Sequence, residues 1–545
     1  MYRLPFLLFF LCSTLNCFPQ LEAIVDEHYG EFSESPGAIV AIYKDGEISF
    51  SKSYGMANLD FEIPIQAKTV FDIGSISKQF TASCIFLLEQ QGKLSIEDPI
   101  QKFLPEMPVY DGDSVRIRHL INHTSGLRDY VEIMAYAGTP FSNTFTEDMG
   151  LDIMSRQSEP NFKAGERLMY NNGGYLLLAV IIRRASGMSI GEFAASHIFE
   201  PLGMKNTFIL ENPNRVIKNG ATAYTRLPNG SIEELHYRNF AIGGDGQIYT
   251  TTEDLLLWDR NFYEPKLGGT QLLDRLHQRG ILNNGDTTTY AGGLFIEKYK
   301  GFRLVHHTGS WGGFVAAFYR FPELRSSMLI LSNYRATGSL KRIYAILDGL
   351  LPSQQSSSKQ TETNELGRYQ PSLETLEKYE GLFEGKTEPH KRFRTYVEND
   401  SLKVHLFWKK QSATLIPIAQ GEFQHASISY MKFDFNQADH APVIHEPLGK
   451  LSSQRTQPFE ALDDVAPYAG IYYSKEVGVS YTISAEGKQL SVKRGEEDLY
   501  LLDQLSPDVF GKNILGFQFK RVDGKPDSFL LHDRRIRNLQ FIKIK

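Results

Sequence analysis

The last third of the chain repeats itself, and this repeat is the strongest constraint on how the chain can fold. An aromatic and glycine pattern that begins at Tyr379 returns at Tyr468 with spacings that agree to a few residues. The matching pairs are Tyr379-x-Gly381-x-Phe383 with Tyr468-x-Gly470-x-Tyr472, Leu402-x-Val404 with Leu490-x-Val492, Phe423 with Phe510, and Phe433-x-Phe435 with Phe517-x-Phe519. Both copies alternate in polarity with the period of a β-strand. The sequence therefore predicts two antiparallel β units, 373–455 and 456–545, each a small barrel or half of one. Neither copy shows a catalytic constellation.

The rest of the chain needs at least one further core, because 545 residues are too many for a single domain. At about 100–200 residues per domain, roughly two to four domains are expected. A Ser/Gln-rich and then charged stretch, 352–372, is predicted to be a linker. The net charge of −6 and the absence of a basic stripe argue against a nucleic-acid partner.

The first 22 residues are predicted to be a signal peptide. Arg3 is followed by an apolar run, Leu4 to Leu11, which is too short to span a membrane. The segment predicts export to the periplasm or beyond, and the alternative is a partly buried N-terminal strand. Cys17 is a candidate for lipid attachment, but the residues before it match a lipoprotein signal poorly.

Between these segments, residues 23–351 mix strand and helix patterns. Strands are expected at both ends and helices in the middle, which favours an α+β domain whose sheet is built from the two ends of the region. The expected strands are Ala38–Tyr43, Ile48–Tyr54, Phe302–Val305, Val315–Phe321 and Ser327–Ser332, and the expected helices are Ser75–Gln91, Tyr175–Ala185 and Ser339–Leu351.

The motif Ser75-Ile76-Ser77-Lys78 is the first candidate for chemistry. A spacing of three places Ser75 and Lys78 on one face of a helix. Serine needs a base within hydrogen-bond reach to act as a nucleophile, and a lysine held in a suitable environment can be that base. Alone the motif is weak, since an ordinary polar first turn is the better explanation of it.

Two further motifs change this interpretation. Tyr170-Asn171-Asn172 precedes an apolar helix, and His307-Thr308-Gly309, followed by Ser310, lies in a run typical of a strand. The three motifs have the order and approximate separation of the penicillin-recognising serine hydrolases. The region from about 30 to 345 resembles class C β-lactamases, D-Ala-D-Ala carboxypeptidases, D-aminopeptidases and related esterases. Further matches are His123-Thr124-Ser125-Gly126-Leu127, Phe199-Glu200-Pro201-Leu202-Gly203-Met204, Gly243-Gly244 and Thr251-Thr252-x-Asp254. The C-terminal repeats resemble, more weakly, the lipocalin-like domains of some D-aminopeptidases.

The resemblance implies a β-lactamase/transpeptidase-like domain and a role for each motif. Ser75 is acylated, Lys78 assists proton transfer and Tyr170 is the second acid/base group. The substrate-binding residues are Asn172 for an amide, Thr308 for a carboxylate or carbonyl, and His307, Gly309 and Ser310 beside it, with the backbone N–H groups of Ser75 and Ser310 forming the oxyanion hole. No metal or other cofactor is implied.

His307 departs from the lysine that usually begins this motif in β-lactamases. Histidine is mostly neutral above about pH 7, so we expect weaker anchoring of a substrate carboxylate, strengthened when His307 is protonated. The sequence predicts an exported acyl-enzyme hydrolase of a small-molecule or peptide substrate, such as one derived from peptidoglycan: a D-Ala-D-Ala carboxypeptidase, a D-aminopeptidase or an esterase. β-Lactamase activity and a catalytically silent penicillin-binding or regulatory module stay open as alternatives.

Overall fold

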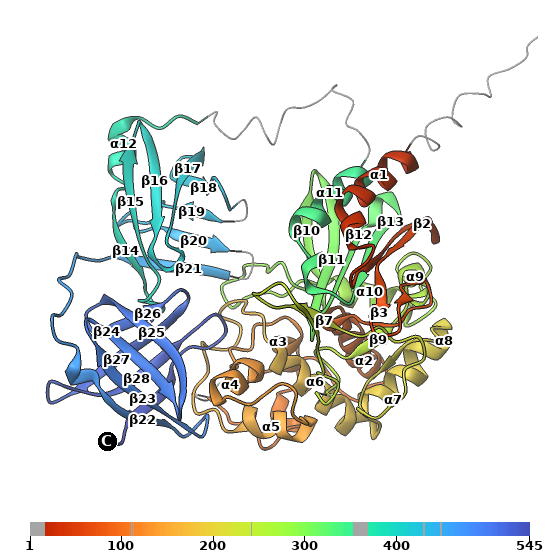
Figure 1. The fold of residues 1–545 in the computed structure, drawn as a ribbon, viewed down its shortest axis with the longest axis horizontal. Coiled ribbons are helices and arrows are strands. Elements are labelled where there is room, and N and C mark those ends of the chain that lie inside the picture. Colours follow the sequence, from red (N-terminus) through yellow and green to blue (C-terminus); the bar gives the residue numbers. More distant parts are fainter. Residues whose placement is uncertain are drawn as a thin grey trace, which may run out of the picture.

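The structure, a computed structural model, describes residues 17–545 except 111, 113, 241, 352–368, 429–430 and 447–448. Figure 1 shows a mixed body of helices and strands, formed by the earlier part of the chain, and two all-β units beside it, formed by the last part. The predicted α+β domain followed by all-β units is confirmed.

A six-stranded antiparallel sheet forms the centre of the mixed body, in the order β10-β11-β12-β13-β1-β2. Its strands are β1 (Ala38–Lys44), β2 (Glu47–Tyr54), β10 (Phe295–Tyr299), β11 (Phe302–Trp311), β12 (Phe314–Phe321) and β13 (Ser326–Ser332). β1 pairs with β13, with Ala38 opposite Ser332, so the two ends of the region share one sheet as predicted. β1 and β13 are apolar runs without alternation because both of their faces are buried.

Helices cover both faces of this sheet. On one face α1 (Cys17–Tyr29) packs against α11 (Leu340–Leu350), and both share a core with Val40 and Ile42. On the other face lie α2 (Lys78–Gln90), α3 (Ile117–Ile121), α4 (Tyr130–Ala137), α5 (Glu147–Ser155), α6 (Asn172–Ser186), α7 (Ile190–Ala194), α8 (Glu200–Leu202), α9 (Thr252–Asn261) and α10 (Gly269–His277). Helices α2 and α6 are buried nearly all round, as expected for helices that are apolar on every side.

Short strands complete the mixed body. They form the pairs β3 (Met56–Asn58) with β4 (Ile63–Pro64) and β7 (Tyr224–Arg226) with β8 (Ile232–Glu234), and the three-stranded sheet of β5 (Phe71–Asp72), β9 (Ile248–Thr250) and β6 (Phe208–Ile209). β5 leads directly to Ser75, so this small sheet fixes the chain just before the first motif.

Two predicted segments lie largely outside the described residues: 1–16 of the signal peptide and 352–368 of the linker. Residue 22, the predicted end of the signal peptide, falls inside α1, and Leu21 of that helix is buried. In the described part of the chain, no helix combines the length and the apolar character needed to cross a membrane.

Each C-terminal repeat closes into its own eight-stranded barrel. The first barrel follows α12 (Leu373–Glu377) and comprises β14 (Gly381–Gly385), β15 (Arg392–Glu398), β16 (Ser401–Leu406), β17 (Gln411–Ala419), β18 (Glu422–His425), β19 (Lys432–Asp434), β20 (Val443–Glu446) and β21 (Gly449–Arg455). The second comprises β22 (Gly470–Ser474), β23 (Val479–Glu486), β24 (Gln489–Arg494), β25 (Glu497–Ser506), β26 (Val509–Lys512), β27 (Leu515–Val522), β28 (Lys525–His532) and β29 (Leu539–Lys543). In each barrel the first strand pairs with the last. Phe383 of β14 lies opposite Arg455 of β21, and Tyr472 of β22 lies opposite Lys543 of β29.

The repeated aromatic residues are the ones that fill the barrels. Tyr379 and Phe423 are buried in the first barrel, and their counterparts Tyr468 and Phe510 are buried in the second. An eight-stranded barrel has an interior that side chains just fill, so inward positions require large apolar residues. This requirement explains why the repeat is visible in the sequence.

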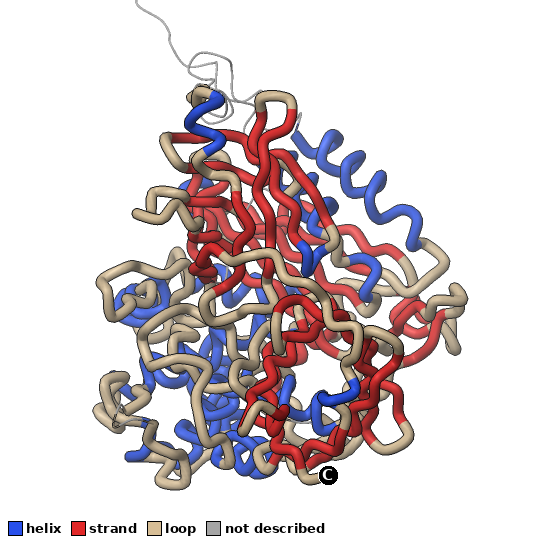
Figure 2. The backbone as a smooth tube through the Cα atoms, turned by 90° about the vertical axis from the view of Figure 1, so that its left-hand side faces the viewer, coloured by secondary structure: helices blue, strands red, loops and turns tan. Residues whose placement is uncertain are grey.

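The second barrel is docked on the mixed body through the loop 533–538, which joins β28 to β29. Figure 2 views the molecule from the side of the barrels, with the second barrel and the end of the chain at the bottom. Arg128, just before α4, forms a buried ion pair with Glu476 of the barrel. Its guanidinium also donates to the carbonyl oxygens of Arg537 and Asn538. Because Ile133 and Tyr136 of α4 belong to the barrel's own apolar core, the two units form one continuous structure here.

Candidate active site

Ser75 lies in a single helical turn, Gly74–Ser77, that runs directly into α2. Gly74 has a φ of +50°, and a Cβ added there would lie 2.8 Å from the backbone nitrogen of Ser310. A Cβ on Gly309 would lie 1.9 Å from the carbonyl oxygen of Ile73 and 3.1 Å from the backbone nitrogen of Ser75. Glycine is needed at both positions for the turn to approach β11 this closely. The approach places the backbone of Ser75 next to that of Ser310, the two residues whose N–H groups the resemblance assigns to the oxyanion hole.

Lys78, one turn after Ser75, is fully buried, and its ammonium group is held by three oxygen atoms. Its Nζ lies 3.1 Å from the Oγ of Ser75, 3.0 Å from the Oδ1 of Asn172 and 2.6 Å from the carbonyl oxygen of Asp245. An ammonium has three donors, so each is used and the position of the nitrogen is fixed. Ser75 and Lys78 therefore meet as the motif predicts.

Tyr170 stands at the end of the segment that leads into α6 and is mostly buried. Lys78 Nζ lies 5.0 Å from the centroid of its ring, and the imidazole of His123 packs on the ring at 4.2 Å. Within the described residues, the hydroxyl group of Tyr170 has no hydrogen-bond partner. A fixed ring with an unpaired hydroxyl next to the nucleophile is ready to exchange a proton with a substrate.

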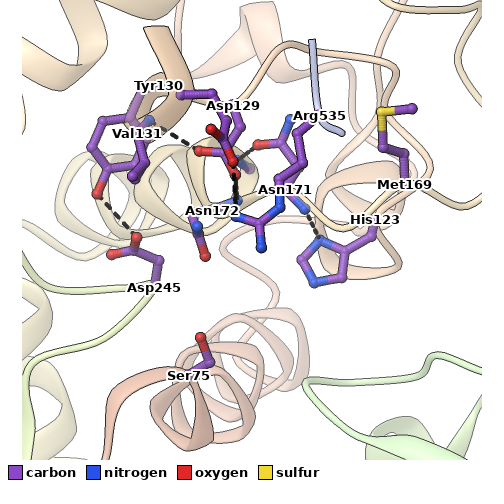
Figure 3. A network of polar contacts seen from close by, with 12 residues as sticks. Ser75, His123, Asp129, Tyr130, Val131, Met169, Asn171, Asn172, Asp245 and Arg535 are labelled. Carbon is purple, nitrogen blue, oxygen red and sulfur yellow. Dashed lines mark hydrogen bonds and ion pairs between the residues drawn. The ribbon is translucent and has the colours of Figure 1, made fainter. Parts of the chain in front are cut away.

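The remaining residue of the second motif, Asn172, is positioned by an aspartate that the motif reasoning did not include. Asp129 is fully buried, and its Oδ2 accepts a hydrogen bond of 3.0 Å from the backbone N–H of Asn172 (Figure 3). The same Oδ2 forms an ion pair with Arg535, a residue of the second barrel. Asp129 thus connects the second motif to the C-terminal unit.

Asp245 is a second residue that the sequence reasoning missed. Its backbone carbonyl accepts from Lys78, and its side chain accepts a hydrogen bond of 3.0 Å from the hydroxyl of Tyr130 (Figure 3). Burial raises the pKa of Asp245 to about 6, although the charge of Lys78 opposes the rise. The available signal was its position directly after Gly243-Gly244, a pair that matches the family.

His307 is close to the other motifs, but its predicted interaction with a substrate carboxylate is wrong in one respect. Its Nδ1 donates to the carbonyl oxygen of Thr308 at 2.6 Å, and its Nε2 accepts from the hydroxyl of Tyr290 at 3.0 Å. Burial, together with the charge of Lys78, lowers the pKa of His307 to about 3. His307 is therefore neutral near pH 7, and protonation between pH 6 and 7.5 cannot strengthen carboxylate binding.

His306 points away from His307, as expected for neighbours on a strand. Its Nε2 lies 3.3 Å from a carboxylate oxygen of Glu297, and its ring stacks on Tyr319 at 4.6 Å. Over the described residues, no group of three or more His, Cys, Asp or Glu side chains is arranged to hold a metal ion.

Two cavities meet at Ser75. The larger has a volume of about 490 Å³ and is lined by Tyr170, His307, Thr308, Gly309 and Ser310. The smaller has a volume of about 50 Å³ and is lined by Asn172, Phe240 and Trp311, among others. All predicted site residues thus lie in one place or beside it, while the roles assigned to them stay predictions.

The C-terminal repeat also reaches this site, which the sequence did not predict. Arg534 and Arg535, from the loop 533–538 of the second barrel, line the larger cavity. The guanidinium carbon of Arg535 lies 5.1 Å from the centroid of the Tyr170 ring. The repeats show no catalytic constellation in the sequence, yet the second barrel contributes part of the wall of this cavity.

Comparison with known proteins agrees with this geometry. Residues 25–351 match the family described as Beta-lactamase. A penicillin-binding protein of Bacillus subtilis (strain 168) is 34% identical over 321 residues, which are 56% of this chain and 70% of that protein. A D-aminopeptidase of Brucella canis is 28% identical, and the match covers 62% of this chain and 64% of that one, just under two thirds of its length.

Solved structures give the same fold. The octameric penicillin-binding protein homologue from Pyrococcus abyssi superimposes with a TM-score of 0.54 at 22% identity, covering 87% of this chain and 98% of that chain. D-amino acid amidase from Ochrobactrum anthropi SV3 gives a TM-score of 0.52 at 22% identity, covering 61% and 98%. On its sequence match and its fold together, the chain belongs to the beta-lactamase family of serine hydrolases.

Proposed function

We propose that the protein is an exported hydrolase that cleaves amide or ester bonds of D-amino-acid peptides through an acyl-enzyme on Ser75. The observation that carries this proposal is the position of Lys78 Nζ, within 3.1 Å of Ser75 Oγ and 3.0 Å of Asn172 Oδ1, beside the unpaired hydroxyl of Tyr170. Relatives named penicillin-binding protein and D-aminopeptidase support the substrate class.

The reaction divides into two transfers. Ser75 Oγ bonds to the substrate carbonyl carbon while its proton passes to the Lys78–Tyr170 pair, which must enter the step one proton short, either with Lys78 as the neutral amine or with Tyr170 as the phenolate. The oxyanion that forms accepts hydrogen bonds from the backbone N–H groups of Ser75 and Ser310. The bond to the leaving atom then breaks, and that atom takes the proton from Tyr170. Water attacks the acyl ester in the same way, giving a carboxylic acid and free Ser75.

A panel of substrates with the Ser75→Ala variant as control tests this proposal. The panel contains a D-alanyl dipeptide, a D-amino-acid nitroanilide, a nitrophenyl ester and a penicillin. We expect turnover of a D-configured peptide, amide or ester, and none by Ser75→Ala. Turnover of penicillin alone would favour the β-lactamase alternative. A stable acyl-enzyme without turnover of any compound would favour the binding module.

Export rests on the sequence of the first residues alone. Expression in a bacterial host, followed by mass analysis of the N-terminus in the periplasmic fraction, tests it. A cleaved chain in that fraction supports export, and a mass increase from lipid on Cys17 would support anchoring. An uncleaved chain in the cytoplasm would contradict both.

A further inference from the structure

The two cavities at Ser75 correspond to the two sides of the bond that is cleaved. The leaving atom must receive a proton, so the group that donates it has to lie on the leaving side. Tyr170 lines the larger cavity and Asn172 lines the smaller one. The cavity of about 490 Å³ therefore holds the leaving group, and the one of about 50 Å³ holds a small acyl side chain.

The leaving-group cavity is positively charged. Three arginines, Arg335, Arg534 and Arg535, line it, and no carboxylate of the described residues does so. His307, also in its wall, is neutral because burial lowers its pKa to about 3. A partly enclosed cavity with charges of one sign attracts ligands of the other sign.

Arg535 lies against the ring of Tyr170, and its guanidinium is not used up by its protein partners. One of its terminal nitrogens lies 3.2 Å from Asp129 and 3.9 Å from Glu132. Its Nε is buried, and no described residue accepts a hydrogen bond from it. In Figure 3 the guanidinium passes Asn172 and points toward the side on which Ser75 lies. A buried donor without an acceptor is costly unless a ligand supplies the acceptor.

The backbone around Arg535 is held from both sides. The side chain of Asn161 donates to the carbonyl oxygen of Arg535 at 2.9 Å and accepts from the N–H of Arg537 at 2.6 Å. Asp533 accepts a hydrogen bond from the hydroxyl of Tyr136. The loop is thus fixed on the mixed body before any ligand arrives, which lowers the entropic cost of binding.

Resting on the function proposed above, we propose that Arg535 of the second barrel is a specificity-determining residue that binds a carboxylate on the leaving group. The second barrel is then part of the substrate site, and the substrate class narrows to peptides and depsipeptides that release an amino or hydroxy acid with a free carboxylate. The carboxylate reaches the cavity wall formed by Arg535, and Thr308 of β11 lines the same cavity.

A matched pair of esters tests this assignment. N-acetyl-D-alanyl-D-lactate and its carboxamide share the acyl group and differ only in the charge of the leaving group. We expect the wild-type protein to prefer the carboxylate by about tenfold or more in kcat/KM, the effect of one charge-assisted hydrogen bond. In Arg535→Gln this preference should disappear, mainly through KM. Arg535 also pairs with the buried Asp129 that holds Asn172, so kcat/KM for the carboxamide should fall as well, and the role of Arg535 is read from the ratio of kcat/KM for the two esters.

Two controls separate recognition from a general loss of structure. Arg535→Lys keeps a positive charge and should retain part of the preference, although it lacks the planar fork of arginine. Lys512→Gln removes an exposed charge from β26 of the same barrel and should leave kcat/KM for both esters unchanged. No carboxylate preference in the wild type, or an equal loss on both esters in Arg535→Gln, would overturn the assignment.

Failure of the proposed function has a different signature. If the wild type hydrolyses neither ester, the substrate class is wrong, and Arg535 is tested by competition instead. Free D-lactate should then protect Ser75 from a fluorophosphonate probe better than D-lactamide does, and Arg535→Gln should abolish the difference. Equal protection by the two compounds in the wild type would overturn the role of Arg535.

Discussion

The ammonium nitrogen of Lys78 lies 3.1 Å from the hydroxyl oxygen of Ser75 and is fully buried. Replacing Lys78 with Met removes this contact and keeps a side chain of similar length. We expect the rate of acylation by a nitrophenyl ester to fall by about 10²- to 10⁴-fold. Stopped-flow measurement of the acylation burst gives the rate directly. A burst rate within about threefold of the wild type would show that Lys78 takes no part in proton transfer.

Replacing Tyr170 with Phe separates catalysis from stability. The hydroxyl has no partner among the described residues, so its removal breaks no hydrogen bond. The free energy of unfolding in urea should stay within about 0.5 kcal/mol of the wild type or rise slightly. Turnover should nevertheless fall by about 10²- to 10⁴-fold, because the proton donor is lost. Equal turnover in the two proteins would remove Tyr170 from the mechanism.

The buried state of His307 predicts how stability depends on pH. Burial, and after it the charge of Lys78, lowers the pKa of His307 to about 3 from the usual value of about 6.5 for histidine. The unfolded chain therefore binds a proton below about pH 6.5 that the folded chain does not. The stability that the neutral His307 contributes is present above pH 6.5 and is lost as the pH falls toward 3.

His307→Gln should reduce this acid dependence. Urea unfolding at several pH values between 6.5 and 4 should give a slope that is smaller by up to about 1.4 kcal/mol per pH unit. Part of the pH dependence of the free energy of unfolding should remain in this variant, because other buried histidines contribute to it. Burial also lowers the pKa of His119 and His277 to about 3. An unchanged slope would mean that His307 is already protonated in the folded protein.

The ion pair of Arg128 and Glu476 holds the second barrel on the mixed body. Breaking it is therefore expected to loosen the docking of the barrel and to lower the activity of the site. The side chains of the two residues are 0% and 8% exposed, so Glu476→Ala leaves an unpaired buried charge. Breaking such a pair costs about 3–5 kcal/mol. We expect loosening of the loop 533–538, seen as faster amide hydrogen exchange, and a lower kcat/KM for anionic esters.

The matched control is Lys488→Ala in the same barrel. Lys488 and Asp463 are 64% and 94% exposed, and an exposed pair contributes about 0–1 kcal/mol. This variant should show the same rate of amide hydrogen exchange in the loop 533–538 and the same kcat/KM for anionic esters as the wild type. A Glu476→Ala variant with unchanged exchange and activity would show that the docking of the barrel does not depend on this pair.

The parts of the fold that follow a regular pattern could be predicted from the sequence. Inward aromatic residues such as Tyr379 and Tyr468 repeat because each barrel must be filled, and β1 and β13 are continuous apolar runs because both faces are covered. The three motifs could be placed because Ser75, Tyr170 and His307 stand at separations that the family shares.

What the sequence could not show depends on packing between distant segments. Arg535 belongs to no motif, and it reaches Tyr170 only because the second barrel docks on α4. The charge of His307 could not be read from its neighbours, since its pKa is set mainly by burial. Asp129 contributes to the site by accepting a hydrogen bond from the backbone N–H of Asn172. Such a contact between distant segments has no motif in the sequence by which it could be recognised.

The most direct test of the account is the mass of the intact protein after treatment with a fluorophosphonate. Ser75, with Lys78 beside it and the backbone of Ser310 close by, should form one covalent adduct per chain. Ser75→Ala should remain unlabelled, and peptide mapping of the wild type should place the added mass on Ser75. Labelling that persists in Ser75→Ala, or an added mass on another residue, would contradict the assignment of Ser75 as the nucleophile.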